Sequence, residues 1–367
     1  MAGLYVHVPF CLKKCPYCDF ASAPAASGSM GEWLQAVRKE TSLRAPDWKS
    51  VRFDTLYFGG GTPSLLDPAD VAKLMDLFSC SFQWERNPEI TLEANPGTLS
   101  GTRLQDFRKA GINRISIGIQ SFLDEELRLL GRLHDSAEAE ASLARAFDSG
   151  FENVNADFIY GLPGQTLEHW RLTMEKAASF PLSHISAYSL TWSNKTELGR
   201  KIESGGVETP SETVQSDLFL WTSAFLASHG FQHYEISNFS LEGRRCRHNE
   251  GYWKGNPYLG LGPSAHSFTG RERYWNVGDT REYCRLLDLD LRPCSGSETL
   301  SRDDIRLETI ALRLRTSEGL PLALIQNKTD SCRIFLENGL ARIRGDRLVL
   351  TENGFLMADE LALRLTV

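Results

Sequence analysis

The stretch His7-Val-Pro-Phe-Cys11-Leu-Lys-Lys-Cys15-Pro-Tyr-Cys18 places three cysteines within eight residues, directly after an apolar, β-branched run. Pro16 disfavours a continuous helix, so the segment is predicted to be a loop wrapped around a ligand. Three thiolates on one loop can hold a [4Fe–4S] cluster and leave its fourth iron without a protein ligand. Zinc is the alternative, but a structural zinc site needs four ligands, and His7 as the fourth lies on the predicted strand.

The bulk composition is that of an ordinary globular protein, with 41% hydrophobic and 24% charged residues. A length of 367 residues favours two domains. The net charge of −7 argues against a nucleic-acid protein that binds through a broad basic surface. No apolar run is long enough to span a membrane, and the N-terminus lacks the features of a signal peptide, so we expect a cytoplasmic protein. The five scattered cysteines are expected to be isolated thiols: Cys80, Cys246, Cys284, Cys294 and Cys332.

Apolar runs alternate with amphipathic stretches through the first half of the chain. The predicted strands are Leu4–Val8, Thr55–Phe58, Ile90–Glu93, Arg114–Ile117, Val154–Asp157 and Ile185–Ser189. The predicted helices are Glu32–Leu43, Pro68–Phe78, Leu104–Ala110, Glu125–Leu130, Ala137–Asp148 and Glu168–Ala178. This alternation predicts an α/β fold with a parallel sheet. Six such units predict a partial parallel (β/α)6 barrel, although periodicity alone also fits an open doubly wound sheet.

The pattern changes after residue 205, and we place a domain boundary there, between residues 1–205 and a smaller, mainly helical domain of residues 206–367. Ser211–Ser228 is a predicted helix, and a polar stretch rich in glycine and aromatic residues follows it, from 232 to 276. Further helices are predicted at Arg302–Arg315 and Ser331–Leu336. Strands at Leu340–Ile343 and Arg347–Leu350 then predict a hairpin, so the end of the chain resembles a winged-helix unit.

The cysteine spacing resembles that of a known superfamily. Cys-x3-Cys-x2-Cys after a first barrel strand, with Tyr17 just before the last cysteine, is the signature of radical S-adenosylmethionine (SAM) proteins. The resemblance implies that the amino and carboxylate groups of SAM chelate the open iron, and that electron transfer then cleaves the sulfonium. Gly59-Gly-Gly-Thr62-Pro63 matches the superfamily's loop for the SAM amino group, where glycine lets the backbone approach a ligand closely.

Five segments resemble the oxygen-independent coproporphyrinogen oxidase group. They are Tyr5-Val-His-Val-Pro-Phe-Cys11, Phe58-Gly-Gly-Gly-Thr-Pro63, Glu93-Ala-Asn-Pro96, Ser116-Ile-Gly-Ile-Gln120-Ser-Phe and Asp157-Phe-Ile-Tyr-Gly-Leu-Pro163. The resemblance implies cofactor contacts from Tyr5, Tyr17, Gly60, Gly61, Thr62, Glu93, Gln120, Arg132, Asp157 and Thr191. Glu93 and Asp157 also end predicted strands, where barrel enzymes carry their active-site residues. Arg132 can pair with a carboxylate. The structural alternative for each is a polar residue that caps a strand or a helix.

Two departures separate the sequence from a true coproporphyrinogen oxidase. Those enzymes carry a further cysteine two places after the third, where this sequence has Phe20. They also have an N-terminal extension that reaches the active site, whereas four residues precede Tyr5 in this sequence. Both departures are normal for the related HemW family of haem chaperones, which the sequence also resembles.

His248-Asn249-Glu-Gly-Tyr252-Trp253 matches the HNxxYW motif of that family, and Gly260-Leu-Gly-Pro-Ser-Ala-His266 follows as it does there. A neutral imidazole can ligate haem iron, and Tyr and Trp can stack on a porphyrin, so His248 is the leading predicted ligand, with His266 and Cys246 as rivals. Three arginines around Cys246 are candidates for propionate contacts. They are Arg244, Arg245 and Arg247. The structural alternatives are aromatic packing at a domain boundary and a solvated basic cluster.

By resemblance, the protein is expected to bind a [4Fe–4S] cluster, SAM and haem, and to deliver haem to haemoproteins such as respiratory cytochromes. A reductant for the cluster is implied, and a homodimer and a peripheral membrane contact stay open. The rival hypothesis is an enzyme, in which a 5′-deoxyadenosyl radical starts the oxidative decarboxylation of coproporphyrinogen III. A radical SAM methyltransferase is the third alternative.

Overall fold

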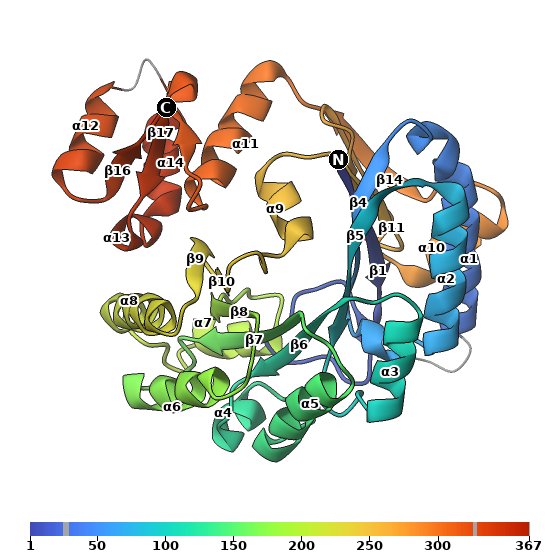
Figure 1. Cartoon of the computed structure of the whole chain (residues 1–367), viewed down its shortest axis with the longest axis horizontal. Coiled ribbons are helices and arrows are strands. Elements are labelled where there is room, and N and C mark those ends of the chain that lie inside the picture. Colours follow the sequence, from blue (N-terminus) through green and yellow to red (C-terminus); the bar gives the residue numbers. More distant parts are fainter. Residues whose placement is uncertain (25–28, 326–328, 367) are drawn as a thin grey trace.

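The computed structural model describes residues 1–24, 29–325 and 329–366 of the chain (Figure 1). A twelve-stranded sheet forms its centre, and six consecutive strands of that sheet are parallel. They are β1 (Ala2–Val8), β4 (Arg52–Gly60), β5 (Gln83–Ala94), β6 (Arg114–Gln120), β7 (Val154–Tyr160) and β8 (His184–Ser189). Each contains one of the six predicted strands, and the sheet curves without closing, so the partial parallel barrel is confirmed.

Helices cover the outer, convex face of these strands (Figure 1). They are α1 (Ser29–Trp48), α2 (Pro68–Ser81), α3 (Gly101–Lys109), α4 (Asp124–Leu129), α5 (Ser136–Asp148) and α6 (Leu167–Ala178). The sequence sets several helix starts locally, because the side chains of Asp67, Ser100, Asp135 and Thr166 accept hydrogen bonds from first-turn amides. All six predicted helices are therefore present, with shifted ends.

Side chains alternate between the two faces of the parallel strands. On β1 the fully buried Leu4, Val6 and Val8 belong to the main hydrophobic core, whereas Tyr5 and His7, which alternate with them, make polar contacts with each other. This alternation leaves the concave interior of the barrel to polar side chains. The site is built there.

The sheet continues beyond the six predicted strands at both edges. Next to β1 lie β11 (Tyr258–Leu261), which is parallel to it, and then the antiparallel β12 (His266–Phe268), β13 (Glu272–Asn276) and β14 (Cys294–Thr299). Next to β8 lie β10 (Asn238–Ser240) and β9 (Gln232–Glu235). These strands were not predicted from the sequence, because most have only three to five residues and mix polar with aromatic side chains. Since the sheet runs across residue 205, the domain division there stays a prediction.

The end of the chain is mainly helical and carries a small sheet of its own. The predicted hairpin is confirmed as β16 (Ala341–Arg344) and β17 (Arg347–Leu350), with β15 (Leu320–Pro321) added to it. The principal helices around it are α11 (Arg302–Leu314), α12 (Thr329–Glu337), α13 (Glu352–Phe355) and α14 (Ala358–Thr366). The remaining elements are β2 (Phe10–Cys11), β3 (Ala23–Pro24), α7 (Glu197–Glu203), α8 (Glu212–Ser228), α9 (Arg247–Trp253), α10 (Thr280–Asp288) and the 3-10 turns Pro63–Leu65 and Leu322–Ile325.

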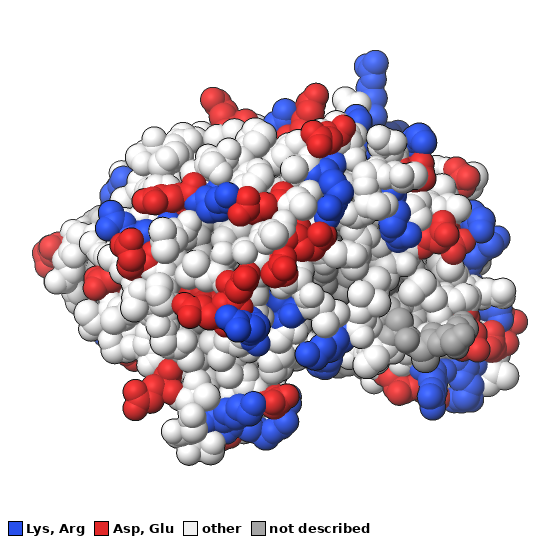
Figure 2. Space-filling model, turned by 90° about the horizontal axis from the view of Figure 1, so that it is seen from below, with Lys and Arg blue, Asp and Glu red and all other residues white. Residues whose placement is uncertain are grey.

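No helix within the described residues has both the length and the apolar character needed to cross a membrane. The face shown in Figure 2 carries Lys and Arg interspersed with Asp and Glu. Charges of both signs alternate on that face instead of forming one extended basic area.

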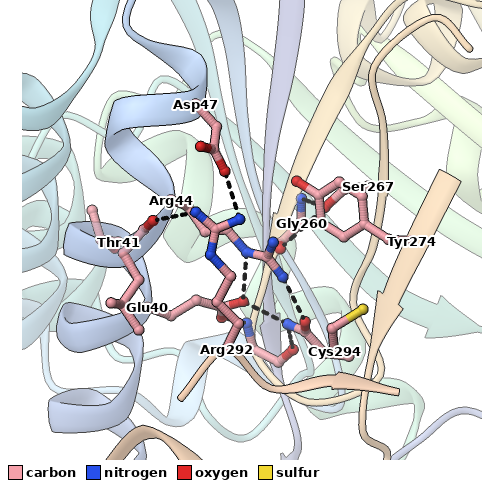
Figure 3. Close-up of polar contacts among 12 residues, drawn as sticks. Glu40, Thr41, Arg44, Asp47, Gly260, Ser267, Tyr274, Arg292 and Cys294 are labelled. Carbon is pink, nitrogen blue, oxygen red and sulfur yellow. Dashed lines mark hydrogen bonds and ion pairs between the residues drawn. The ribbon is translucent and has the colours of Figure 1, made fainter. Parts of the chain in front are cut away.

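A buried carboxylate ties α1 to the late strands of the sheet. Glu40 is fully buried and accepts hydrogen bonds from the Gly262 amide (2.9 Å), Asn276 Nδ2 (2.7 Å) and the Tyr283 hydroxyl (2.7 Å). Arg44, one turn further along α1, lies 3.7 Å from the same carboxylate. Figure 3 shows Glu40 and Arg44 among the polar contacts between α1 and strands β11 to β14. The Glu40 side chain therefore fixes the loop at Gly262, which lies more than two hundred residues later in the chain.

We predict that Glu40→Ala lowers the free energy of unfolding by about 3–5 kcal/mol, because it leaves the buried Arg44 without its counter-charge. It also leaves the donors on Gly262 and Tyr283 without their acceptor. Chemical denaturation at neutral pH measures this loss. Glu32→Ala, at an exposed position on the same helix, is the matched control and should change stability by less than about 0.5 kcal/mol. Equal effects of the two variants would contradict the anchoring role.

Candidate functional site

The three cysteines lie on the loop that leaves the carboxyl end of β1. Their thiols are free and partly exposed, and the Cys18 amide donates to the Cys15 carbonyl (3.1 Å), which closes a turn between them. Two donors point at the sulfurs: Thr62 Oγ1 lies 3.6 Å from Cys11 Sγ, and Arg132 Nη1 lies 3.8 Å from Cys15 Sγ. Hydrogen bonds to cysteine sulfur stabilise a thiolate and tune a bound cluster.

The donor set fits an iron–sulfur cluster. Within residues 1–24, 29–325 and 329–366, no three His, Cys, Asp or Glu side chains converge on a point that could hold one metal ion. A single zinc ion needs its ligands gathered around one point, whereas a [4Fe–4S] cluster takes each thiolate on a different iron. Three free thiols on one loop supply the donor set that such a cluster takes.

The glycine loop after β4 is shaped by the cysteine loop. Gly60 has a φ of +111°, and a Cβ atom there would come within 2.7 Å of the His7 ring. A Cβ atom on Gly61 would lie 2.5 Å from the Phe10 carbonyl oxygen. The Gly61 and Thr62 amides donate to the carbonyls of Val8 and Phe10 at 2.8 and 2.7 Å. Glycine is thus required here because the loop packs closely on the cysteine-bearing segment. This requirement is separate from the approach of a ligand.

Glu93 stands in the concave interior beside this loop. It accepts hydrogen bonds from the Tyr57 hydroxyl (2.8 Å) and the Gly60 amide (3.2 Å). Burial, with the nearby Asp157 charge as a smaller cause, raises the pKa of Glu93 to about 7. These contacts orient the Glu93 carboxylate, which can accept a hydrogen bond from a ligand or pair with a positively charged group of it.

Asp157 ends a chain of hydrogen bonds that crosses the barrel. Ser116 Oγ and Asn155 Nδ2 donate to its two oxygens at 2.9 and 2.8 Å. The Asn155 amide oxygen in turn lies 2.6 Å from His184 Nδ1, and His184 Nε2 lies 2.7 Å from the Tyr234 hydroxyl. Burial lowers the pKa of His184 well below its usual value, so the ring is neutral: Nδ1 donates to the amide oxygen and Nε2 accepts from tyrosine. Every donor in the chain thus points towards Asp157.

The other predicted SAM contacts are unevenly placed. Arg132 Nη2 donates to the Gly118 carbonyl (2.7 Å) and to Asn95 Oδ1, beside the cluster loop. Gln120 is buried with a φ of +72° at the end of β6. Thr191 is exposed beyond β8. Tyr5 donates from its hydroxyl to His7, and burial raises the pKa of Tyr5 and of Tyr17. The structure therefore gathers most of this set at one end of the barrel, with Thr191 at its rim.

A cavity of about 310 Å³ adjoins the cluster loop. Its walls include Leu12, Cys15, Thr62, Asn95 and Arg132. Four residues of the site were not predicted from the sequence: Asn95, Tyr57, Asn155 and His184. The signal that could have found them is the period of two on each strand, because Tyr57, Asn155 and His184 occupy positions that face the concave side.

The HNxxYW motif forms α9, which packs inside the barrel against β1 and β4. His248 is buried, with Nδ1 2.8 Å from Thr55 Oγ1 and Nε2 2.9 Å from the Tyr252 hydroxyl. Its ring stacks on Tyr57 at 5.0 Å, and burial lowers its pKa to about 3. Trp253 packs edge-on against Tyr234. Both ring nitrogens of the leading predicted haem ligand are therefore occupied within the protein.

The residues around Cys246 are similarly engaged. Cys246 is fully buried next to Glu89, and burial raises its pKa to about 12, which keeps the thiol protonated. Arg244, Arg245 and Arg247 form ion pairs with Glu152, Glu250 and Asp54, respectively. His266, the remaining rival, is exposed on β12. Of the histidines in this region, His266 is the accessible one.

The comparisons with known proteins agree with this geometry. Residues 5–177 match the model of the radical SAM superfamily. The structure superimposes on coproporphyrinogen III oxidase (HemN) from Escherichia coli with a TM-score of 0.86 and 26% identity, covering 100% of this chain and 90% of that one. The heme chaperone HemW of Mycobacterium tuberculosis is 37% identical over 97% of this chain and 93% of its own length. The Bacillus subtilis protein of the same name is 31% identical over 98% of both chains.

The fold and the cysteine loop together define a radical SAM protein, a class that implies a [4Fe–4S] cluster and SAM. Within that class, the chain belongs to the HemW family of heme chaperones, because the similarity extends over nearly the whole of both sequences.

We predict that Glu93→Gln stabilises the protein at neutral pH and weakens SAM binding. Because the folded pKa of Glu93 is raised to about 7, ionising it costs the folded state stability as pH rises from about 4.5 to 7. The stability gained by glutamine should therefore grow through that window to at most about 3 kcal/mol and then level off. Denaturation at several pH values, with SAM titration, measures both effects. A gain independent of pH would contradict the shifted pKa.

We predict that the triple replacement of Cys11, Cys15 and Cys18 by alanine abolishes the cluster. Anaerobically reconstituted wild type should contain about four irons and four sulfides and, after one-electron reduction with dithionite, show a paramagnetic resonance signal that SAM perturbs. Cys80→Ala, at an exposed cysteine outside the site, is the control and should keep full iron content. A cluster in the triple variant, or zinc alone in the wild type, would refute the assignment.

Proposed function

We propose that this protein binds haem and delivers it to acceptor haemoproteins, such as respiratory cytochromes, with the cluster and SAM supporting or gating the transfer. The observation that carries the proposal is the 37% identity to a heme chaperone over 97% of this chain and 93% of that protein. We place this activity in the cytoplasm and expect a reductant for the cluster as a further partner.

The chain's own residues would prepare the site in three ways. Cys11, Cys15 and Cys18 would hold the cluster, which supplies one-electron chemistry when it is bound. The Gly60–Thr62 loop would keep the backbone close to the cysteine loop, leaving room for a ligand at the open iron. Glu93 and Asp157 would present acceptors for the amino and hydroxyl groups of SAM, with Tyr57 and Asn155 fixing their orientation.

We predict that reconstituted protein loaded with haem transfers it to an apo-cytochrome. The transfer is followed by the acceptor's absorption spectrum, at equal concentrations, with and without SAM and a reductant. Free haem at the same concentration is the control for passive exchange. If the protein neither binds haem nor accelerates its transfer over that control, the proposed function is wrong.

The rival is oxidative decarboxylation of coproporphyrinogen III, which the likeness to HemN favours. Phe20 stands where the oxidases carry a further cysteine, and its side chain is 66% exposed on the loop beyond Cys18. We therefore expect no decarboxylation in an anaerobic assay with SAM and reductant, analysed by mass spectrometry. The Escherichia coli oxidase, assayed in parallel, is the positive control. Protoporphyrinogen formed at a rate comparable to that control would establish the rival.

A further inference from the structure

The chain has eight histidines, and their contacts set one of them apart. Seven engage at least one ring nitrogen in a hydrogen bond or an ion pair: His7, His134, His169, His184, His229, His233 and His248. His266 makes no such contact with any described residue and is exposed. An iron ligand needs a neutral imidazole with an accessible lone pair, and partial loss of solvent around the ring, with the nearby Arg273, lowers the pKa of His266, which favours that form.

His266 stands beside aromatic side chains on the same face of the sheet. It lies opposite Trp275 on β13, and the two rings stack with centroids 5.6 Å apart and an angle of 24°. Phe268, two residues further along β12, lies on the same face and contacts Tyr258. We call Tyr258, Phe268 and Trp275 the aromatic wall. Phe268 is buried and backs the wall, whereas the half-buried Trp275, next to the accessible imidazole, offers a ring against which a flat, apolar macrocycle can pack.

The aromatic wall lies on the concave side of the sheet. Tyr258 packs edge-on against Tyr252 of α9, which sits inside the barrel. Residues of opposite parity on β13 face the other way: Tyr274 contacts Arg44 and Trp48 of α1 on the convex side. Since β11 pairs with β1 and matches Gly260 to Tyr5, His266 lies two strands away from the strand that carries the cluster loop.

The backbone around His266 is fixed by several polar contacts. Ser267 Oγ accepts from the Gly260 amide (2.9 Å), and both residues are labelled in Figure 3. Gly260 must be glycine, because a Cβ atom there would lie 2.1 Å from the His266 carbonyl oxygen. Glu40 holds the preceding Gly262 amide, so this loop is anchored from α1 as well. The backbone position of His266 is thus set before any ligand binds.

We infer that His266 supplies the axial bond to haem iron, with the porphyrin against the Trp275 end of the aromatic wall, and that His248 is a structural residue. This inference rests on the proposed function, and it moves the ligand from α9 to β12. The imidazole donates its lone pair to iron, and no electron is transferred in that step. His248 could ligate iron only by breaking its contact with Thr55 or Tyr252 inside the core.

The test compares haem complexes of four proteins by absorption and electron paramagnetic resonance, with ferric haem added to anaerobically reconstituted full-length chain. Wild type should show an imidazole-ligated haem, and His266→Ala should lose that signature and recover it when free imidazole is added. His248→Ala should keep the signature while lowering thermal stability. His229→Ala, at the exposed histidine that follows the last residue of α8, is the matched control and should change neither.

Trp275→Leu, which keeps His266, should weaken haem binding roughly three- to tenfold, the loss expected for one aromatic contact. Four outcomes would overturn the inference. If His266→Ala keeps the imidazole signature, His266 is not the ligand. If His248→Ala alone loses the signature, the ligand lies on α9. Haem bound by wild type without an imidazole signature overturns the inference and leaves the proposed function standing. No haem bound by wild type overturns both.

Discussion

The parallel pairing of β1 with β4 on one side and with β11 on the other is the constraint on which the whole site depends. The cysteine loop leaves the carboxyl end of β1, the glycine loop leaves that of β4, and the segment to His266 leaves that of β11. Carboxyl ends of parallel strands share one edge of a sheet, so three loops distant in sequence meet there. The zero exposure of Leu4, Val6 and Val8 shows how firmly β1 is held.

Side chains alternate between the two faces of each parallel strand. Because Leu4, Val6 and Val8 of β1 are buried in the hydrophobic core, the side chains between them face the concave interior, which is polar. Burying Glu93 and Asp157 is unfavourable unless donors surround them, and Tyr57, Gly60, Ser116 and Asn155 provide such donors. The raised pKa values of both carboxyl groups show that this compensation is incomplete in the free protein. A ligand with positive charge and hydroxyl groups would complete it, which is the physical reason for reading the interior as a binding site.

The HNxxYW segment shows how a motif and its geometry can point to different roles. As sequence, it offers a histidine with two aromatic residues at a spacing suited to a flat ligand. In the fold, α9 fills the barrel interior, where His248 bonds to Thr55 and Tyr252 and stacks on Tyr57. The α9 segment also meets the hydrogen-bond chain from Asp157, because the Cys246 amide donates to the Tyr234 hydroxyl at 3.2 Å. The position of α9 is therefore suited to a structural role, in which the helix supports the polar side chains of the barrel interior.

Features that depend on residues close together in the chain could be predicted from the sequence. Cysteine spacing, the proline in the loop, the glycine triplet and the alternation of strands with helices predicted the cluster loop and the partial barrel. The late strands β9 to β14 escaped prediction, because three to six residues with mixed polarity become strands only when a neighbouring edge supplies the hydrogen bonds. Whether His248 or His266 is accessible, and which partners hold Glu40 and Asp157, depends on contacts between segments tens to hundreds of residues apart. These properties cannot be inferred from the sequence, since burial and the pairing of donors with acceptors arise when the segments pack together.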